Sequence, residues 1–442
     1  MSNYHSIVAI VGRPNVGKST LFNRIIGSQT SIISSKSGTT RDRIISETKW
    51  GDKEFILIDT GGIQDNKENE LSDAVRLQSI IGIDESDAII MVLDVKEEIT
   101  SLDLDVVQIL RKTNKPIVLA LNKTDNVKLN DELVDFYQLG FEKQIKISAY
   151  HNIGIDDLMT EVISEIPIEP GNEFNETDAD IKISIVGRPN VGKSHLLNAL
   201  TNEERTIVSN IPGTTRDSID SFMSYKDKQI MLIDTAGIRR KGQIKPGIEK
   251  ASVIRTIKAV LRSDVSILMI DATELLTNQD AHVLGYVLDH FRSLVIAINK
   301  WDLAIKKGMK KEETLEKIKA QFPFAKFAKI IFISAKEKTG LEDLLDASFT
   351  ALKNWKTELS PYDLKKFVRE AISAYPPATT GRHALKIYGV RQTGISPPSL
   401  TFYVNNTEFI HFSYQRYLEN FMRSKHDFEG TPIKMSFRGR KR

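Results

Sequence analysis

The octapeptide Gly-Arg-Pro-Asn-Val-Gly-Lys-Ser occurs at residues 12–19 and again, 175 residues later, at 187–194. Four further motifs follow it in the same order in both halves: Gly-Thr-Thr-Arg-Asp at 38–42 and 213–217, Leu-Ile-Asp-Thr at 57–60 and 232–235, Asn-Lys-x-Asp at 122–125 and 299–302, and Ser-Ala at 148–149 and 334–335. Such a recurrence predicts two copies of one domain, with insertions only late in the second copy.

Within the first copy, short apolar runs alternate with amphipathic stretches of helical periodicity. The apolar runs lie at 6–11, 55–58, 88–93, 116–121 and 145–147. This alternation predicts an α/β fold, a mostly parallel sheet with helices on both faces. Ligands of such folds bind at the carboxyl ends of the strands, which is where the repeated motifs fall.

Length and composition allow three globular domains. Of the 442 residues, 40% are hydrophobic and 27% charged, as in ordinary globular proteins. An acidic, polar stretch with a Pro-Gly pair predicts a linker. The expected order is a first repeat domain at 1–167, the linker at 168–180, a second repeat domain at 181–355 and a third domain at 356–442.

The sequence shows no targeting or membrane feature. No apolar run approaches the roughly 20 residues that span a bilayer, and the first ten residues do not resemble a signal peptide. The chain has no cysteine, which excludes disulfides and cysteine-based metal sites. We expect a cytoplasmic monomer without a membrane partner.

The octapeptide matches the P-loop pattern Gly-x-x-x-x-Gly-Lys-Ser, followed by helices predicted at 20–26 and 195–200. Its glycines let backbone N–H groups turn toward phosphate oxygens. The lysines should reach the β- and γ-phosphates, and the serine hydroxyls should ligate Mg²⁺. A glycine-rich turn without a ligand is the alternative for a single match. The predicted phosphate-binding residues are Gly12, Arg13, Pro14, Asn15, Val16, Gly17, Lys18 and Ser19, and Gly187, Arg188, Pro189, Asn190, Val191, Gly192, Lys193 and Ser194.

An aspartate begins the next motif, Asp-Thr-Gly-Gly in the first copy and Asp-Thr-Ala-Gly in the second. The aspartate should hold Mg²⁺ through its water shell, and the last glycine N–H can contact the γ-phosphate. The Thr-Thr pair before it suits a segment that orders on the triphosphate, although alone it would indicate an ordinary loop. This motif adds Asp59, Thr60, Gly61 and Gly62, and Asp234, Thr235, Ala236 and Gly237.

Asn-Lys-x-Asp after an apolar strand predicts which base binds. Its carboxylate can accept from the N1–H and 2-amino groups of guanine, whereas adenine would leave the carboxylate unpaired. The alanine N–H of Ser-Ala can donate to guanine O6. The predicted guanine-binding residues are Asn122, Lys123, Thr124, Asp125, Ser148 and Ala149, and Asn299, Lys300, Trp301, Asp302, Ser334 and Ala335. The expected ligands are GTP or GDP with Mg²⁺.

These motifs together resemble the translation-factor-related GTPases, and among them the bacterial ribosome-assembly GTPases with tandem G domains and a basic C-terminal domain. The likeness covers nearly the whole chain, including LIDTAGIRRKG at 232–242 and FEGTPIKMSFRGRKR at 428–442. It implies two P-loop NTPase G domains, a KH-like domain and GTP hydrolysis. It also implies action on the large ribosomal subunit precursor and its rRNA.

The resemblance assigns further roles by position. Thr40 and Thr215 would be Mg²⁺ ligands and join Lys18 and Lys193 as catalytic residues. The P-loop asparagines, Asn15 and Asn190, resemble K⁺ ligands of potassium-activated members.

Ile63 and Ile238 stand where many GTPases carry a water-orienting glutamine. Isoleucine cannot polarise water, so another group must help position the nucleophile. We therefore expect slow intrinsic hydrolysis that K⁺ stimulates.

The C-terminal region is basic, with 15 Lys/Arg against 7 Asp/Glu from residue 356 to 442. This charge fits a polyanionic partner or, more simply, a solvated basic face. Predicted elements are helices at 356–374 and 414–425 and strands at 385–390, 400–404 and 433–437, an order that resembles a small α+β KH-like domain. No glycine lies between 405 and 429, so the usual Gly-x-x-Gly clamp is absent. RNA contacts would be phosphate-directed, through Arg438, Arg440, Lys441 and Arg442.

Two other functions share parts of this pattern. A GTPase of tRNA modification would have the same P-loop and Gly-Thr-Thr-Arg-Asp motifs, but normally also a C-terminal cysteine. A GTP-sensing scaffold would bind nucleotide without hydrolysing it. The two copies also differ, because the stretch at 64–70 is acidic whereas the equivalent stretch contains the basic run 239–241. We expect competent sites with divided labour, the second facing RNA.

Overall fold

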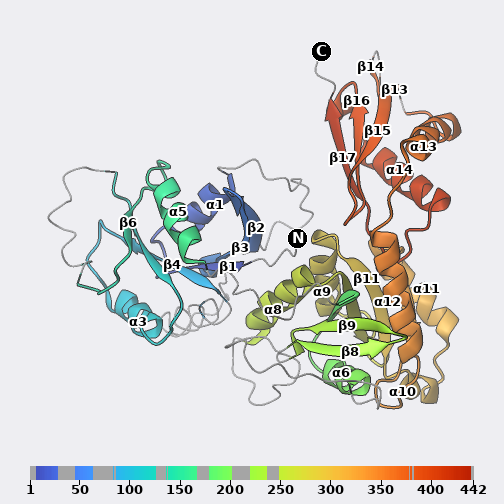
Figure 1. The fold of residues 1–442 in the computed structure, drawn as a ribbon, viewed down its shortest axis with the longest axis horizontal. Helices are drawn as coiled ribbons and strands as arrows, with labels where there is room; N and C mark the ends of the chain where they lie inside the picture. Colours follow the sequence, from blue (N-terminus) through green and yellow to red (C-terminus); the bar gives the residue numbers. More distant parts are fainter. Residues whose placement is uncertain are drawn as a thin grey trace. The chain divides into compact units, whose positions relative to one another are not determined.

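The structure is a computed structural model that describes residues 6–27, 45–62, 83, 86–125, 136, 138–166, 179–201, 220–235, 248–377, 379–380 and 383–439. The chain divides into two compact units (Figure 1). One unit comprises residues 1–175 with 243–255, and the other comprises residues 176–242 with 256–442. No helix within the described ranges is long and apolar enough to cross a bilayer.

The first unit contains a six-stranded sheet in the order β2-β3-β1-β4-β5-β6. All neighbouring strands are parallel except β2 and β3, which form an antiparallel pair. Its strands are β1 (Ser6–Val11), β2 (Ile45–Trp50), β3 (Lys53–Asp59), β4 (Ala88–Asp94), β5 (Ile117–Asn122) and β6 (Gln144–Lys146). Its helices are α1 (Lys18–Gly27), η1 (Thr60–Gly62), α3 (Ser101–Leu110) and α5 (Ile155–Glu165).

Strand β1 is buried on both faces. Val8 and Ile10 pack in one core cluster with the apolar sides of α1 and α5. Ala9 and Val11 point the other way, into a cluster with the apolar side of α3. A parallel strand covered by helices on both sides needs apolar residues at successive positions, and for this reason the apolar runs mark the strands. The predicted α/β fold is confirmed.

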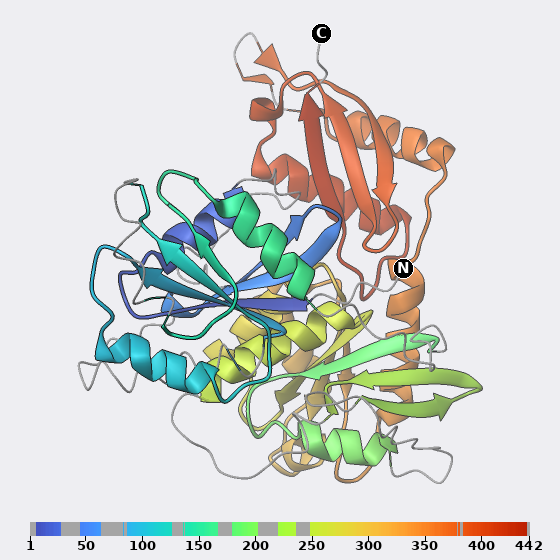
Figure 2. The same cartoon turned by 60° about the vertical axis from the view of Figure 1, so that its left-hand side comes forward.

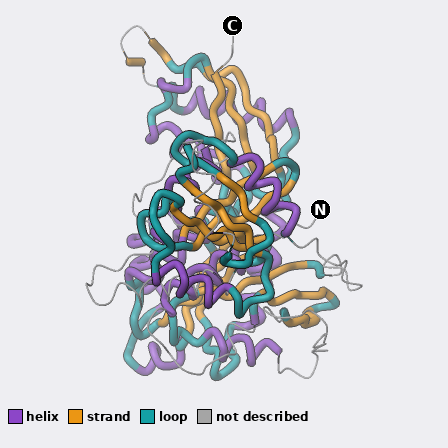
Figure 3. Tube along the Cα trace, turned by 90° about the vertical axis from the view of Figure 1, so that its left-hand side faces the viewer, coloured by secondary structure: helices purple, strands orange, loops and turns teal. Residues whose placement is uncertain are grey.

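The second repeat has the same topology, with strand order β12-β11-β10-β7-β9-β8; Figure 3 distinguishes helices from strands by colour. Its strands are β7 (Ile181–Val186), β8 (Ser221–Tyr225), β9 (Lys228–Ile233), β10 (Val265–Asp271), β11 (Ser293–Asn299) and β12 (Lys329–Phe332). Its helices are α6 (Lys193–Thr201), α8 (Ile248–Arg262), α9 (Asn278–Asp289), α10 (Trp301–Lys306), α11 (Lys311–Gln321), η3 (Pro323–Ala325) and α12 (Leu341–Trp355). Helices α10 and α11 lie between Asn-Lys-x-Asp and Ser-Ala, where the motif spacing increases.

The C-terminal module has a three-stranded sheet, β15-β16-β17, packed against two helices (Figure 2). The α-β-β-α-β order is as predicted, with a short hairpin, β13 and β14, that the sequence did not indicate. The elements are α13 (Pro361–Ala374), β13 (Thr379–Thr380), β14 (His383–Ala384), β15 (Ile387–Gly394), β16 (Ser399–Val404), η4 (Thr407–Phe409), α14 (Phe412–Lys425) and β17 (Lys434–Gly439).

The helix predicted at 356–374 starts later than expected, at Pro361. Ser360 is its N-cap, and the Ser360 side chain accepts a hydrogen bond from the Asp363 N–H. Proline suits the first helical position because it has no N–H to satisfy. Apolar periodicity alone extends the predicted helix on the N-terminal side of this start signal.

A short loop fixes the C-terminal module to the second G-type domain. The Gly430 N–H donates to the Phe327 carbonyl at 2.7 Å, and its carbonyl accepts from the Leu294 N–H at 2.8 Å. The Thr431 hydroxyl donates to the Ala351 carbonyl at 3.0 Å. Main-chain bonds of this kind hold the loop against β11 and α12 irrespective of most side chains.

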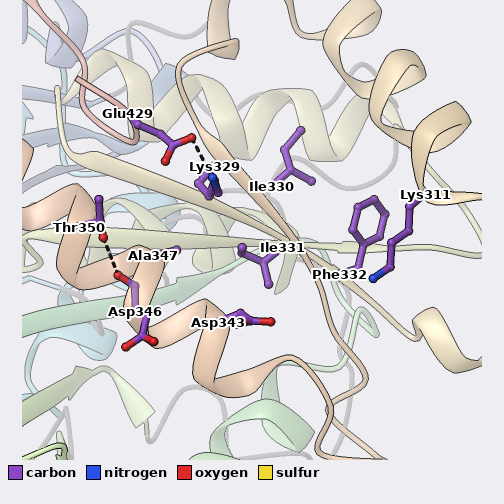
Figure 4. Close-up of a pocket in the computed structure, with 10 residues that line it drawn as sticks. All are labelled: Lys311, Lys329, Ile330, Ile331, Phe332, Asp343, Asp346, Ala347, Thr350 and Glu429. Atoms are coloured by element: carbon purple, nitrogen blue, oxygen red, sulfur yellow. Dashed lines mark hydrogen bonds and ion pairs between the residues drawn. The ribbon is translucent and has the colours of Figure 1, made fainter. Parts of the chain in front are cut away.

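The residues of the first unit that correspond to this attachment site make different ion pairs. There Lys143, beside β6, pairs with Glu161 and Glu165 of α5. In the second unit the equivalent Lys329 pairs instead with Glu429, at 3.0 Å (Figure 4). A cavity of about 440 Å³ beside this pair is lined by β12 and α12 and contains no residue of the nucleotide motifs.

We expect Gly430→Ala to weaken this attachment. Gly430 has a φ of +74°, and a Cβ there would lie 2.6 Å from the Ala351 Cβ. Backbone strain and overpacking together should lower the free energy of unfolding by roughly 2–4 kcal/mol.

The matched control is Gly308→Ala, since Gly308 has a φ of +77° and open space around it. Its free energy of unfolding should fall only by the cost of the left-handed backbone, about 1–2 kcal/mol. Urea-induced unfolding of both variants measures the difference. Equal losses would mean that the contact with Ala351 does not constrain the loop.

Candidate nucleotide sites

In both units the P-loop runs from the end of a central strand into a helix, from β1 to α1 and from β7 to α6. Gly17 and Gly192 have φ values of +100° and +104°, which favour glycine. A Cβ on either would lie 2.3 Å from an asparagine Nδ2. The second glycine of each motif is therefore required by a tertiary contact as well as by its backbone conformation.

That contact comes from the asparagine of Asn-Lys-x-Asp. The Asn122 Nδ2 donates to the Val16 carbonyl at 2.8 Å, and its Oδ1 accepts from the Ala149 N–H at 3.0 Å. In the second unit Asn299 bonds in the same way to Val191 and Ala335. Each asparagine thus joins the P-loop to the Ser-Ala motif, and both its polar atoms are engaged by main chain.

The serine and aspartate predicted to ligate Mg²⁺ meet in the first site. The Ser19 hydroxyl donates to Asp59 Oδ2 at 2.6 Å, and the Gly61 N–H donates to Asp59 Oδ1 at 2.8 Å. Two hard oxygen ligands converge at the P-loop, which fits Mg²⁺. No group of three or more His, Asp or Glu side chains gathers as a metal site in the described ranges.

The equivalent aspartate of the second site has a different backbone. Asp59 is the last residue of β3, whereas β9 ends at Ile233 and Asp234 follows it with a φ of +56°. The Asp234 N–H donates to the Asp220 side chain at 2.9 Å, and Asp220 is itself paired with Arg262 at 2.5 Å. The backbone that carries this carboxylate therefore has a different conformation in each site.

The P-loop lysines bond to carbonyl groups of their own loops. The Lys18 Nζ donates to the Arg13 carbonyl at 2.6 Å, and the Lys193 Nζ donates to those of Gly187 and Arg188 at 2.6 and 2.8 Å. Burial lowers the pKa of Lys18 to about 8. A cation held on carbonyl oxygens in this way is directed toward the centre of the loop, where phosphates are expected.

The two aspartates predicted to read the base have different neighbours. Asp125 is paired with Lys96 at 3.0 Å, and this ammonium group holds the pKa of Asp125 below its usual range. Asp302 instead accepts from the Ser334 hydroxyl at 2.7 Å. Position 96 corresponds to Thr273 in the second unit, so an exposed ion pair is specific to the first site.

A second aspartate supports each Asn-Lys-x-Asp lysine. Lys123 pairs with Asp94 at the end of β4, and Lys300 pairs with Asp271 at the end of β10. Neither aspartate belongs to a predicted motif, although their spacing of 177 residues matches that of the motif they support. Trp301, predicted at the base, packs its side chain on Phe332 in the core, with ring centres 4.4 Å apart.

Several predicted residues lie outside the described ranges. They are Thr40, Thr215, Ala236, Gly237, Ile63, Ile238, the basic run 239–241, Arg440, Lys441 and Arg442, together with most of the linker. His195 is exposed in the first turn of α6.

The comparisons with known proteins agree with this architecture. A family described as 50S ribosome-binding GTPase matches residues 7–123 and 182–300, and the KH-domain-like family of EngA bacterial GTPase enzymes matches 359–438. The FeoB G domain of Methanococcus jannaschii is 26% identical over 39% of this chain and 98% of its own, with a TM-score of only 0.28. The fold and the paired motif sets define a GTPase with two G domains and a KH-like module.

Full-length relatives narrow this class. GTPase Der of Staphylococcus carnosus is 45% identical over 97% of this chain and 98% of its own. GTPase Der of Herpetosiphon aurantiacus is 45% identical over 98% and 96%. The chain belongs to the Der family of GTPases, as the motifs had indicated.

The pKa of Lys18 predicts that GDP binding at the first site weakens above pH 8. Below about pH 8 the Lys18 side chain is charged in the free protein. Above this pH it is mostly neutral, and it must take up a proton to bind the phosphates as an ammonium group. The apparent dissociation constant should rise with pH, by at most about tenfold per unit.

Calorimetry on Lys193→Ala, which disables the second site, isolates this effect. Titrations at pH 8.5 in two buffers of different ionisation enthalpy should reveal uptake of more than about half a proton per GDP. Binding without proton uptake at this pH would show that Lys18 remains charged.

Proposed function

We propose that this chain hydrolyses GTP at two sites in order to act in assembly and stability of the large (50S) ribosomal subunit. The observation that carries the proposal is the pairing of two complete motif sets with a basic module attached to the second of them. Membership of the Der family supports GTP hydrolysis, and the matched family's description supports a ribosomal partner. The domain limits 1–167, 181–355 and 356–442 are part of this proposal.

Each site would hold GTP through three groups of residues. The P-loop amides and Lys18 or Lys193 would bind the phosphates. Mg²⁺, held by the P-loop serine and the following aspartate, would neutralise developing charge when bound. The Asp125 and Asp302 carboxylates would select guanine. Asn122 and Asn299 would position the P-loop, since their polar atoms already bond to main chain.

K⁺ stimulation is the finer part of the enzymatic proposal. Asn15 and Asn190 both have a φ of +66°, and both are exposed at the turn of the P-loop. Their side-chain oxygens are therefore accessible to a cation beside the phosphates. Such a cation would stabilise charge where no arginine is available.

Phosphate release should accordingly be faster in K⁺ than in Na⁺ at matched ionic strength. Asn15→Ala and Asn190→Ala should each remove the K⁺ dependence of one site, and the double variant should remove all of it. Equal rates in the two salts for the unaltered protein would eliminate the cation. Multiple turnover in the same assay separates an enzyme from a GTP-sensing scaffold.

The KH-like module is the proposed rRNA contact. Tyr414 and Tyr417 pack inward, their hydroxyls donating to the Tyr375 and Ala371 carbonyls at 3.1 and 2.7 Å. Burial raises the pKa of Tyr414 to about 12. Phe412, by contrast, is exposed (60%). RNA binding would therefore depend mainly on charge, which Arg438 and its neighbours supply.

Subunit sedimentation tests the ribosomal role. The protein should pellet with large-subunit precursors in the presence of a slowly hydrolysed GTP analogue and dissociate in GDP. Lys18→Ala and Lys193→Ala should alter this response separately, because each disables one site. Association that ignored the nucleotide and was equal for small and large subunits would overturn the role.

A further inference from the structure

The arginine of each P-loop points away from the expected phosphates, toward a buried carboxylate. Arg13 Nε donates to Asp103 Oδ2 at 3.0 Å, and its terminal nitrogen donates to Glu97 at 2.7 Å. Only 2% of the Asp103 side chain is exposed, whereas Glu97 is 56% exposed. The Arg13–Asp103 pair is thus shielded from water, whereas solvent and salt screen the Arg13–Glu97 pair.

Asp103 also caps the N-terminus of helix α3. It is the third residue after the N-cap Thr100, whose N–H and hydroxyl donate to Asp103 Oδ2 at 3.0 and 2.7 Å. Its other oxygen, Oδ1, is buried without a hydrogen-bond partner among the described residues. Burying an under-bonded carboxylate costs stability. A neutral side chain could complete the capping box, so capping alone does not explain the aspartate.

The arrangement recurs in the second unit with a different fit. Asp280 follows the N-cap Thr277 in the same way and is fully buried. Arg188 Nε is 3.6 Å from Asp280 Oδ1, beyond hydrogen-bond distance. Both of these atoms are buried without a hydrogen-bond partner in the described part of the chain. A terminal nitrogen of Arg188 donates instead to Glu274, to the Glu274 carboxylate at 2.9 Å and to the Glu274 carbonyl at 3.2 Å.

The arginine main chain connects this pair to the phosphate lysine. The Arg13 carbonyl accepts from Lys18 Nζ at 2.6 Å, and the Arg188 carbonyl accepts from Lys193 Nζ at 2.8 Å. Fixing the arginine side chain therefore restrains the peptide that orients the lysine. A restrained loop pays less ordering entropy when the nucleotide arrives.

We propose that Asp103 and Asp280 are positioning residues that hold each P-loop through its arginine, and that the restraint is tighter in the first site. Arg13 and Arg188 then act as connectors between loop and helix and not as nucleotide ligands. The inference rests on the proposed nucleotide sites, and it adds a residue pair that lies outside every motif of the repeat.

Asp103→Asn tests the restraint while keeping the shape and hydrogen-bond acceptor of the capping box. It is made in Lys193→Ala, so that only the first site binds a fluorescent GDP analogue. The dissociation constant should increase about tenfold, because the Arg13 guanidinium would then bond to a neutral amide oxygen and no longer to a carboxylate. Asp280→Asn, made in Lys18→Ala, should increase it less, about threefold or below, since the Arg188–Asp280 contact is longer.

Asp105→Asn is the matched control, because Asp105 is an exposed residue of the same helix. It removes the same charge near the N-terminus of α3 and should leave the dissociation constant unchanged. An equal effect of Asp103→Asn and Asp105→Asn would overturn the restraint in favour of a general charge effect. Analogue binding by Lys193→Ala itself tests the nucleotide site independently.

A double-mutant cycle excludes a merely structural role. Arg13→Gln and Asp103→Asn should each weaken binding, and the double variant should be no weaker than the worse single one, because both break the same link. Additive effects would overturn the proposal. Loss of helicity in Asp103→Asn would also count against it, since the capping acceptor is retained.

Discussion

The side chain of one asparagine, at the end of β5 in the first unit and of β11 in the second, holds together three segments that are distant in sequence. Asn122 bonds to the P-loop carbonyl of Val16 and to the amide of Ala149, and Asn299 does the same in the second unit. Buried and fully bonded, such a group fixes the geometry of everything it touches. The glycine before each P-loop lysine follows from it, because the amide occupies the space of a Cβ.

Around this shared frame the two sites have diverged in the groups that determine their electrostatics. The carboxylate predicted to read the base faces an ammonium in the first site and a hydroxyl in the second. The aspartate proposed to hold Mg²⁺ ends a strand in the first site and has a left-handed backbone in the second. The scaffold is the same while the local charge differs, which supports the idea that the two sites divide the work.

The second repeat has also acquired an attachment point. Where the first unit pairs Lys143 with two glutamates of its own helix, the second has alanines at the equivalent positions of α12, and its lysine pairs with Glu429 of the C-terminal module. Small residues on the helix allow the loop at Gly430 to approach the backbone closely. The small side chains on this face of α12 leave a surface on which the C-terminal module is fixed.

From the sequence alone come the repeat, the α/β class, the residues of each motif and, to within a few residues, the strands marked by apolar runs, but not β2 or the short hairpin of β13 and β14. The sequence predicts these features because phosphate binding and strand burial impose local residue types at fixed spacing. Arg13 illustrates what it could not decide. Its motif membership suggested a nucleotide ligand, yet its partner is Asp103, 90 residues away. Only the tertiary structure determined such partners, because a hydrogen bond depends on which helix end packs beside the loop, and neither spacing nor composition records that.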